Sequence, residues 1–218
     1  LTIPNSVCLI GSYACRDCSN FTGTLTLPNN LKKINTETFR NCSSVTKIAF
    51  NNNITEINSN AFYNCTKLTE VTLPADLTSV ENGVFRYCYS LTTVNLPPKL
   101  TKIYDYAFEY CSSLTKIEFP ESLQSIMTSA FGYCISLPKI VLPKNISNLS
   151  PYAFYHCSGA KGELIIPESI TSVSNSVFMY CTNLTKLTLH SFFLTLSNSS
   201  FRECNSLVEV NFSTKINT

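Results

Sequence analysis

Charge is scarce in this chain. Only 14% of its 218 residues are Asp, Glu, Lys or Arg, and the formal net charge is +2. No run of lysine or arginine supplies the field that captures a phosphate backbone, so we expect no nucleic-acid partner. No apolar run approaches the roughly 18–20 residues of a membrane span, so we expect no membrane contact within this segment.

The groups that catalysis requires are also few. A nucleophile needs a base within reach, and the only two histidines, His156 and His190, are expected at the surface or the rim. Acidic residues such as Glu118, Glu121 and Glu163 are scattered along the chain, and the six glycines form no phosphate-binding loop. The sequence therefore predicts no enzyme activity, no catalytic residue and no cofactor.

The layout of a signal peptide, basic and then apolar, is missing as well. The chain opens with "LTIP", already inside a repeat, and ends with "VNFSTKINT" in the middle of one. We interpret the sequence as part of a longer array.

The dominant feature of the sequence is a repeat. Cysteines recur at intervals of 23 or 24 residues, and from Cys42 onward a phenylalanine stands three residues before each. Each unit continues with a Leu-x-x-Ile/Val-x-Leu/Phe block, usually a proline, and a second apolar pair such as Leu100 and Ile103. The phenylalanines are Phe39, Phe62, Phe85, Phe108, Phe131, Phe154, Phe178 and Phe201. We expect like positions of successive units to line up in rows.

A unit of this length is too short to bury its own apolar side chains, so the units must stack around one shared core. In "LTKIEFP", Ile117 and Phe119 alternate with polar residues, which is typical of a half-buried strand, and Pro120 ends the strand. The "YAFEYC" segment is expected to form a single turn. Two longer units contain Gly23 and Gly162, which we expect to absorb a local kink.

The pattern AFxxCxxLxxIxLPxxLxxI resembles the BspA-like branch of the leucine-rich repeat family over the whole chain. The departures are Cys15 for the phenylalanine, Asn51 and His190 for the proline, and Val84 and Val177 for the alanine. The resemblance implies an α/β leucine-rich-repeat solenoid, a right-handed superhelix. Its parallel sheet would line the concave face, with short turns or one-turn helices on the convex side. We expect residues 1–218 to form one domain of about nine repeats.

The cysteine column is expected to be structural. Equivalent residues on adjacent coils lie about 4.8 Å apart. Their Cβ vectors point the same way, which leaves the Cβ atoms farther apart than the ~3.8 Å of a disulfide. The only C-x-x-C, Cys15 to Cys18, belongs to core columns. We therefore predict a ladder of buried thiols and no metal site.

Outward-facing strand residues are candidates for recognition. Val141 beside Ile165 is the only apolar spot in these columns, and charged residues flank it, as in an interaction patch. The predicted patch consists of Lys116, Glu118, Lys139, Val141, Glu163 and Ile165. Alternatively, the charged column only keeps the sheet soluble.

A second candidate column stands one residue before each cysteine and includes Tyr87, Tyr110 and Tyr133. Tyrosines are rigid amphipathic side chains that suit contacts with a partner protein. The alternative is that they shield the edge of the core and hold one another.

Glycosylation sequons lie towards both ends of the chain, and none begins between residues 65 and 144. If the chain is secreted, glycans cover both ends and leave the middle coils bare. The candidate sites are Asn20, Asn53, Asn145 and Asn183. Several other sequons, such as the one at Asn41, arise from the repeat itself.

The resemblance implies a surface protein of bacteria or parasitic protists with a role in adhesion. We therefore predict a non-enzymatic protein-recognition module, at the cell surface or secreted. Its concave face would contact a host or extracellular-matrix protein. The alternative is an intracellular leucine-rich-repeat scaffold, which free thiols favour and the sequons disfavour. The sequence leaves the oligomeric state open.

Overall fold

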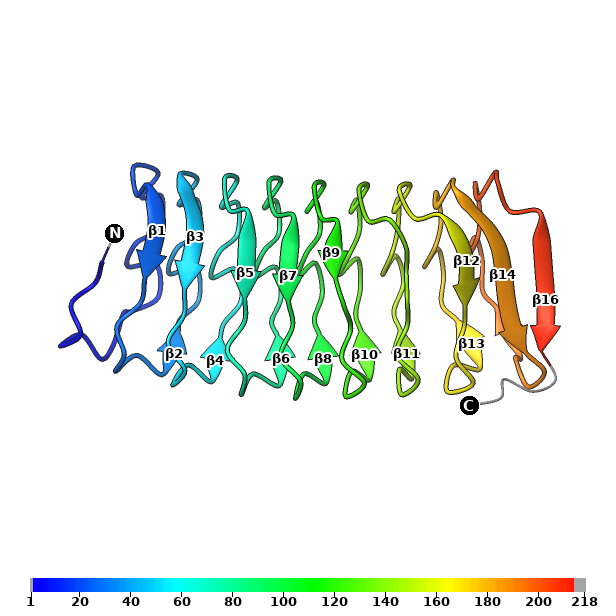
Figure 1. The fold of residues 1–218 in the computed structure, drawn as a ribbon, viewed down its shortest axis with the longest axis horizontal. Helices are drawn as coiled ribbons and strands as arrows, with labels where there is room; N and C mark the ends of the chain where they lie inside the picture. Colours follow the sequence, from blue (N-terminus) through cyan, green and yellow to red (C-terminus); the bar gives the residue numbers. More distant parts are fainter. Residues whose placement is uncertain (1, 214–218) are drawn as a thin grey trace.

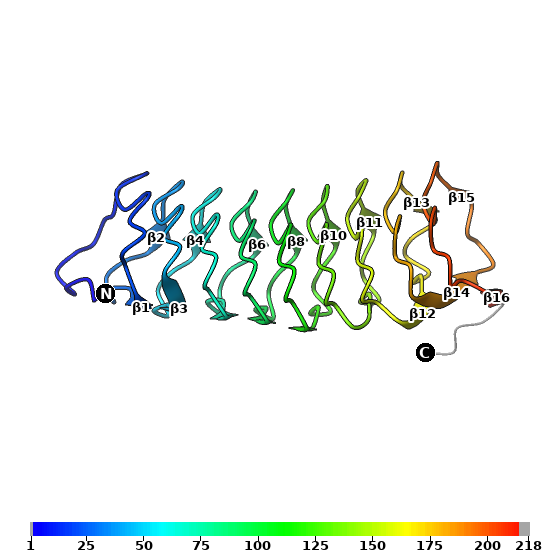
Figure 2. The same ribbon diagram turned by 90° about the horizontal axis from the view of Figure 1, so that it is seen from above.

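The computed structural model describes residues 2–213, which wind into a parallel β-solenoid of about eight turns. Figure 1 shows the coils side by side along one axis, with β1 at one end of the stack and β16 at the other. The stack bends only slightly when it is seen from above (Figure 2). The sheet that we expected on a concave face is therefore the side of a nearly straight stack.

The first strand of most coils joins one long parallel face. This face is split into β1-β3-β5-β7-β9 and β12-β14-β16. Its strands are β1 (Gly23–Thr26), β3 (Val45–Ala49), β5 (Glu70–Thr72), β7 (Thr93–Asn95), β9 (Lys116–Ile117), β12 (Gly162–Ile165), β14 (Leu184–His190) and β16 (Glu209–Ser213). The register pairs Lys47 with Glu70 and Thr93 with Lys116, so the outward columns lie in rows as expected.

A second set of short strands follows the proline of each unit, or the Asn51 or His190 that replaces it. These two-residue strands pair in parallel with their equivalents within three groups, β2-β4, β6-β8-β10-β11 and β13-β15. They are β2 (Lys33–Ile34), β4 (Glu56–Ile57), β6 (Ser79–Val80), β8 (Lys102–Ile103), β10 (Ser125–Ile126), β11 (Asn148–Leu149), β13 (Ser172–Val173) and β15 (Thr195–Leu196). All of them except β15 place one apolar residue in the core, such as Ile103. The second apolar pair of the repeat is therefore a strand.

Of the short turns or one-turn helices expected on the convex side, the turns are present, but residues 2–213 contain no helix, so the helical part of the expected α/β class is not confirmed. The "YAFEYC" segments form consecutive turns, in which Tyr106 and Tyr110 both have left-handed backbones with φ of 58° and 61°. Such residues interrupt a right-handed helical path. The N–H of Phe108 donates instead to the carbonyl of Ala130 on the next coil, at 2.8 Å. This side of the coil is thus tied to its neighbour much as a strand is.

Phenylalanines stack along the whole core, which confirms the predicted rows. Ring centroids of successive residues from Phe39 to Phe201 lie 5.2–5.7 Å apart, and the rings are close to parallel. All but the last ring are fully buried. Each buried phenylalanine contributes about 1.5–3 kcal/mol by transfer from water. The rings set the spacing of the coils on the turn side.

The cysteine column is a ladder of unpaired thiols, as predicted. From Cys42 onward each thiol of the column donates to a carbonyl of the preceding coil, for example Cys111 to Phe85 and Cys134 to Phe108, both at 3.3 Å. A small side chain with an S–H donor fits this position. Burial raises the pKa of the Cys88 thiol to about 12, which keeps it protonated and unreactive.

The two longer units confirm the predicted role of their glycines. Gly23 and Gly162 have φ of +72° and +79°, a region that glycine occupies without strain. The strand register shifts directly after each of them. The extra residue is thus absorbed at the start of the strand.

Candidate recognition surface

The long face is interrupted between β9 and β12. The intervening segment, residues 138–142, belongs to no strand. On the earlier coils a threonine holds this edge: Thr92 donates to the carbonyl of Thr69, and Thr115 to that of Thr92, each through both its N–H and its hydroxyl. Pro138 occupies the next position in this row and has neither donor. The row of hydrogen bonds therefore lacks the link from position 138 to Thr115, and it resumes where the N–H of Lys161 donates to the carbonyl of Pro138 at 3.0 Å.

Phe119 is a second cause of the interruption. It stands where other coils have a smaller side chain, such as Leu73 or Ile166, and its ring contacts Phe131 edge-on at 5.3 Å. The ring also reaches Phe154, at 6.2 Å and one coil further on. Phe50, the equivalent residue near the N-terminus, likewise precedes a weak junction, where β3 and β5 share a single residue pair. A bulky ring at this position separates the coils.

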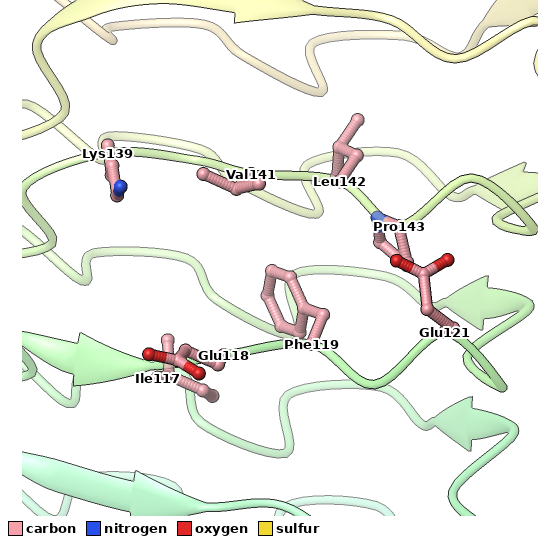
Figure 3. A pocket seen from close by; sticks show the side chains of 8 residues that line it. All are labelled: Ile117, Glu118, Phe119, Glu121, Lys139, Val141, Leu142 and Pro143. Carbon is pink, nitrogen blue, oxygen red and sulfur yellow. The ribbon is translucent and has the colours of Figure 1, made fainter. Parts of the chain in front are cut away.

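A cleft of about 320 Å³ opens at the interruption. Figure 3 shows its two lips, which are the segment that continues β9 and the equivalent segment of the next coil. The lining residues are Ile117, Glu118, Phe119, Glu121, Lys139, Val141, Leu142 and Pro143. We call this feature the inter-coil cleft.

Apolar side chains around the inter-coil cleft are more exposed than those of the same rows on the preceding coils. Val141 is 60% exposed and Ile165, on the following coil, is 46% exposed. Ile117 is only partly buried, whereas Val94 in the same row is fully buried. The opening thus exposes part of the core.

Charged side chains at the inter-coil cleft are free of ion pairs. Within residues 2–213, Lys116, Glu118 and Lys139 form none. On the intact sheet nearby, Lys186 lies 3.6 Å from Glu163 and 3.4 Å from Glu209. Glu163 is therefore engaged within the protein, whereas the charges at the opening remain available.

The structure brings together some of the predicted patch and separates the rest. Glu118, Lys139 and Val141 line the inter-coil cleft, and Lys116 precedes it on β9. Glu163 and Ile165 lie on β12, beyond the interruption. Sequence reasoning missed Ile117, Phe119, Glu121, Leu142 and Pro143. Two features of the sequence pointed to them. Pro138 stands where other coils have a threonine, and Phe119 stands where most coils have a leucine or isoleucine.

The tyrosine column lies on the turn side, away from the inter-coil cleft. Tyr87 and Tyr110 stack at 5.0 Å between ring centroids, and Tyr110 and Tyr133 at 4.3 Å. All three have left-handed backbones with φ of 60–63°, which costs a residue with a Cβ about 1–2 kcal/mol. Their stacking shows that they hold one another, as the structural alternative predicted.

The same row changes chemistry towards the N-terminus. There Asn41 donates to Asp17 and Asn64 donates to Asn41 through their side-chain amides, at 2.6 Å and 3.0 Å. Asparagine and aspartate tolerate the left-handed conformation better than tyrosine does. The middle coils thus have tyrosine at a position where asparagine adopts the same backbone conformation with less strain.

Glu109 is buried beside this tyrosine stack and forms an ion pair with Arg86. Burial raises the pKa of Glu109, and the Arg86 charge opposes this shift. Arg86 also lies over the rings of Tyr87 and Tyr106, at 4.9 Å and 4.6 Å. These contacts fix the turn side of the middle coils.

The four glycosylation candidates are exposed. Three of them use the side-chain amide to tie their coil to the preceding one: Asn53 donates to Asn29, Asn145 to Glu121 and Asn183 to Ser158. No such bond is described for Asn20. A sugar on Asn20 would therefore disturb the least.

The expectation that both histidines lie at the surface or rim is wrong for His190, which is fully buried. Its Nε2 lies 2.8 Å from the carbonyl of Ile170, and its Nδ1 accepts the N–H of Phe192. Asn51, the other substitute for the proline, likewise donates to two carbonyls of the preceding coil. Both residues stabilise, through side-chain hydrogen bonds, the turn that follows a proline in the other units.

Within residues 2–213, no group of three or more His, Cys, Asp or Glu side chains is placed to hold a metal ion. No helix of this region is long and apolar enough to cross a membrane.

Solved structures of bacterial leucine-rich repeat proteins resemble this fold. The T. pallidum protein TpLRR matches with a TM-score of 0.70 and 24% identity, over 95% of this chain and 83% of that chain. The pneumococcal vaccine antigen PcpA matches with a TM-score of 0.56 and 23% identity, over 100% and 69%. A leucine-rich repeat protein from Bacteroides ovatus gives 0.56 and 23%, over 94% and 59%. No curated protein matches the chain.

These likenesses show the fold, and a family model shows the relationship. The model of the BspA type leucine rich repeat region, which holds six copies of the repeat, matches residues 1–115 and residues 101–218. The two matches together span the chain, which therefore belongs to the BspA-type leucine-rich repeat family.

Proposed function

We propose that the chain is a non-enzymatic protein-recognition module of a cell-surface or secreted protein, and that it serves adhesion by contacting a host or extracellular-matrix protein. The inter-coil cleft is the observation that supports this most directly. It joins exposed apolar side chains with unpaired charges, the composition of an interface core and its rim. Leucine-rich repeat proteins are generally non-enzymatic and mediate protein contacts.

The contact surface that we propose is the long sheet face, centred on the inter-coil cleft. Lys116, Lys139 and Val141 would contribute directly, and Ile165 would extend the apolar area to the next coil. Tyr87, Tyr110 and Tyr133 would form a separate contact on the turn side. Their stacked, half-buried rings support this second role, because rigid amphipathic side chains suit contacts with a partner.

A surface location is supported by three observations. The family resemblance implies it, one structural neighbour is a vaccine antigen, and the four sequon asparagines are exposed. The intracellular scaffold remains the alternative, since the unpaired thiols fit a reducing compartment. The intact mass of the natively produced protein separates the two: added hexose-rich mass supports secretion, and an unmodified mass supports the scaffold.

Binding to immobilised fibronectin, laminin and collagen, measured by surface plasmon resonance, tests the proposed function. We expect at least one of them to bind the wild type, and the Lys116→Ala/Lys139→Ala/Val141→Ala variant to lose most of that affinity. Lys32→Ala/Gln124→Ala removes exposed side chains near the second set of strands and serves as the matched control. An equal loss in the control, or no loss in the triple variant with the fold intact, would place the contact elsewhere.

A further inference from the structure

The inter-coil cleft is elongated along the strand direction. One lip is formed by residues 117–121 and the other by residues 139–143, and the two run parallel (Figure 3). The other sides of these coils stay closed, because Phe108 and Phe131 stack at 5.2 Å and Ser125 pairs with Asn148. A helix, about 10 Å across with its side chains, is too wide to enter such an opening. An extended segment lying along the lips is the shape that fits.

Backbone groups at the lips are available to such a segment. At closed junctions the N–H of Leu73 donates to Asn95, and that of Ile166 donates to Thr188, at 3.1 Å and 3.0 Å. Among the described residues, the equivalent N–H of Phe119 has no backbone bond to Val141. The bond is also missing at Leu96, where β7 and β9 still pair through other residues. At Phe119 no other pairing replaces it, so an extended chain can bond there as an added strand does.

The wall of the inter-coil cleft is apolar. Ile117 and Phe119 contribute from one lip, and Val141, Leu142 and Pro143 from the other. The volume of about 320 Å³ accommodates one bulky aliphatic or aromatic side chain of the bound segment. Such a side chain would bury the apolar surface that the interruption exposes.

Charge at the opening is unevenly distributed. In Figure 3, Lys139 and Glu118 lie towards one end and Glu121 lies at the other, beside Pro143. Glu121 accepts the backbone N–H of Lys144 at 3.3 Å, and within residues 2–213 it has no ion pair. One lysine therefore faces two carboxylates, and the Glu121 end has no cationic side chain paired with it. A cation on the bound segment complements this end.

We infer that the inter-coil cleft binds an extended segment of a partner protein, in which a bulky apolar residue enters the opening and a neighbouring arginine or lysine meets Glu121. This inference rests on the proposed function and adds the chemistry of the partner. A free small molecule is disfavoured, because unpaired backbone groups along the lip suit a peptide.

Three peptides test this inference. Each is acetylated and amidated, with a glycine–serine background and a central phenylalanine followed by arginine, by glutamate or by serine. Methyl-labelled protein is titrated with each peptide and followed by NMR. We expect the arginine peptide to shift the methyl signals of Ile117, Val141 and Leu142, to leave those of Ile34 and Ile57 unmoved, and to bind most tightly. Binding of the glutamate peptide should be the weakest.

Variants separate the charge from the opening itself. Glu121→Gln should weaken the arginine peptide about threefold and leave the serine peptide unchanged. Glu168→Gln, at the equivalent turn two coils further on, is the matched control. No methyl shifts with any peptide, or an equal response to all three, would overturn the inference. Loss of matrix-protein binding in the triple alanine variant would still support the proposed function, so the two can fail separately.

Discussion

The junction between the coil of β9 and β10 and the next coil, which holds β11, is closed on two sides and open on the third. On the turn side the phenylalanine rings keep a spacing of 5.2–5.6 Å across this region, and on the side of the short strands β8, β10 and β11 pair without interruption. On the long face the pairing stops at β9 and resumes only at β12. A shared core therefore does not force all sides of a solenoid to close. Pro138 and Phe119 stand at the junction where this side opens, and that opening is where partner contacts are proposed.

Truncating a ring on each side gives the largest expected effect. Phe131→Ala removes a fully buried ring from the closed stack and should lower the free energy of unfolding by about 3–5 kcal/mol. Phe119→Ala removes a partly exposed ring at the lip and should cost only about 1–2 kcal/mol. Urea denaturation followed by circular dichroism measures both. Equal costs would mean that the two sides are packed alike.

Closing the inter-coil cleft should raise the free energy of unfolding, by less than the ring truncations lower it. Pro138→Thr restores the N–H and hydroxyl donors of the threonine row, each worth about 0.5–1.5 kcal/mol. Loss of the proline's restriction on the unfolded chain offsets about 0.4–1 kcal/mol of this. We expect a net stabilisation of about 1 kcal/mol and weaker binding of matrix proteins.

The control for this closure is Thr92→Pro, which should open a junction that is now closed and destabilise the protein. If Pro138→Thr left both stability and binding unchanged, Pro138 would not be the cause of the opening.

Removing one lysine within the interruption or one on the intact sheet should have the smallest effect on stability. Lys186→Ala breaks contacts with two carboxylates and should lower the denaturation midpoint slightly, whereas Lys139→Ala should leave it unchanged. A hydrogen bond from Asn211 and the charge of Lys186 lower the pKa of Glu209. A carboxyl whose pKa is lower in the folded state than in the unfolded state stabilises the fold at pH values above the unfolded pKa. This stabilisation is lost as the pH falls through the folded-state pKa. The difference between wild type and Lys186→Ala should therefore be present at pH 7 and fade in acid. A difference that grows in acid would contradict this assignment.

Most of the fold was predictable because it follows from spacing. Rows of Phe85, Phe108 and Phe131, buried thiols and kinks at the two glycines all result from stacking equal units, and stacking is visible in the sequence. The turn side was not predictable in the same way. Whether "YAFEYC" forms a helical turn depends on the left-handed backbone of Tyr106 and Tyr110, which tertiary hydrogen bonds impose.

The candidate site was predictable only in part. Val141 stood out because it is an apolar residue in an outward-facing column, and Lys139 because it flanks that residue. The inter-coil cleft beside them depends on the hydrogen-bond donors that Pro138 lacks and on the contacts that the Phe119 ring makes with Phe131 and Phe154. Both effects involve the neighbouring coils. A pattern read along one unit does not show them. Likewise, the sequence alone indicated a surface position for His190. In the structure both of its ring nitrogens form hydrogen bonds in a buried turn.

Amide hydrogen exchange is the most direct test of an opening confined to one side. Because exchange reports local hydrogen bonding, segments 117–121 and 139–142 should exchange rapidly. Segments 123–127 and 146–150 of the same coils, and strands β5 and β7, should remain protected. Equal protection of all these segments would show that the long face is closed and would remove the basis for placing recognition there.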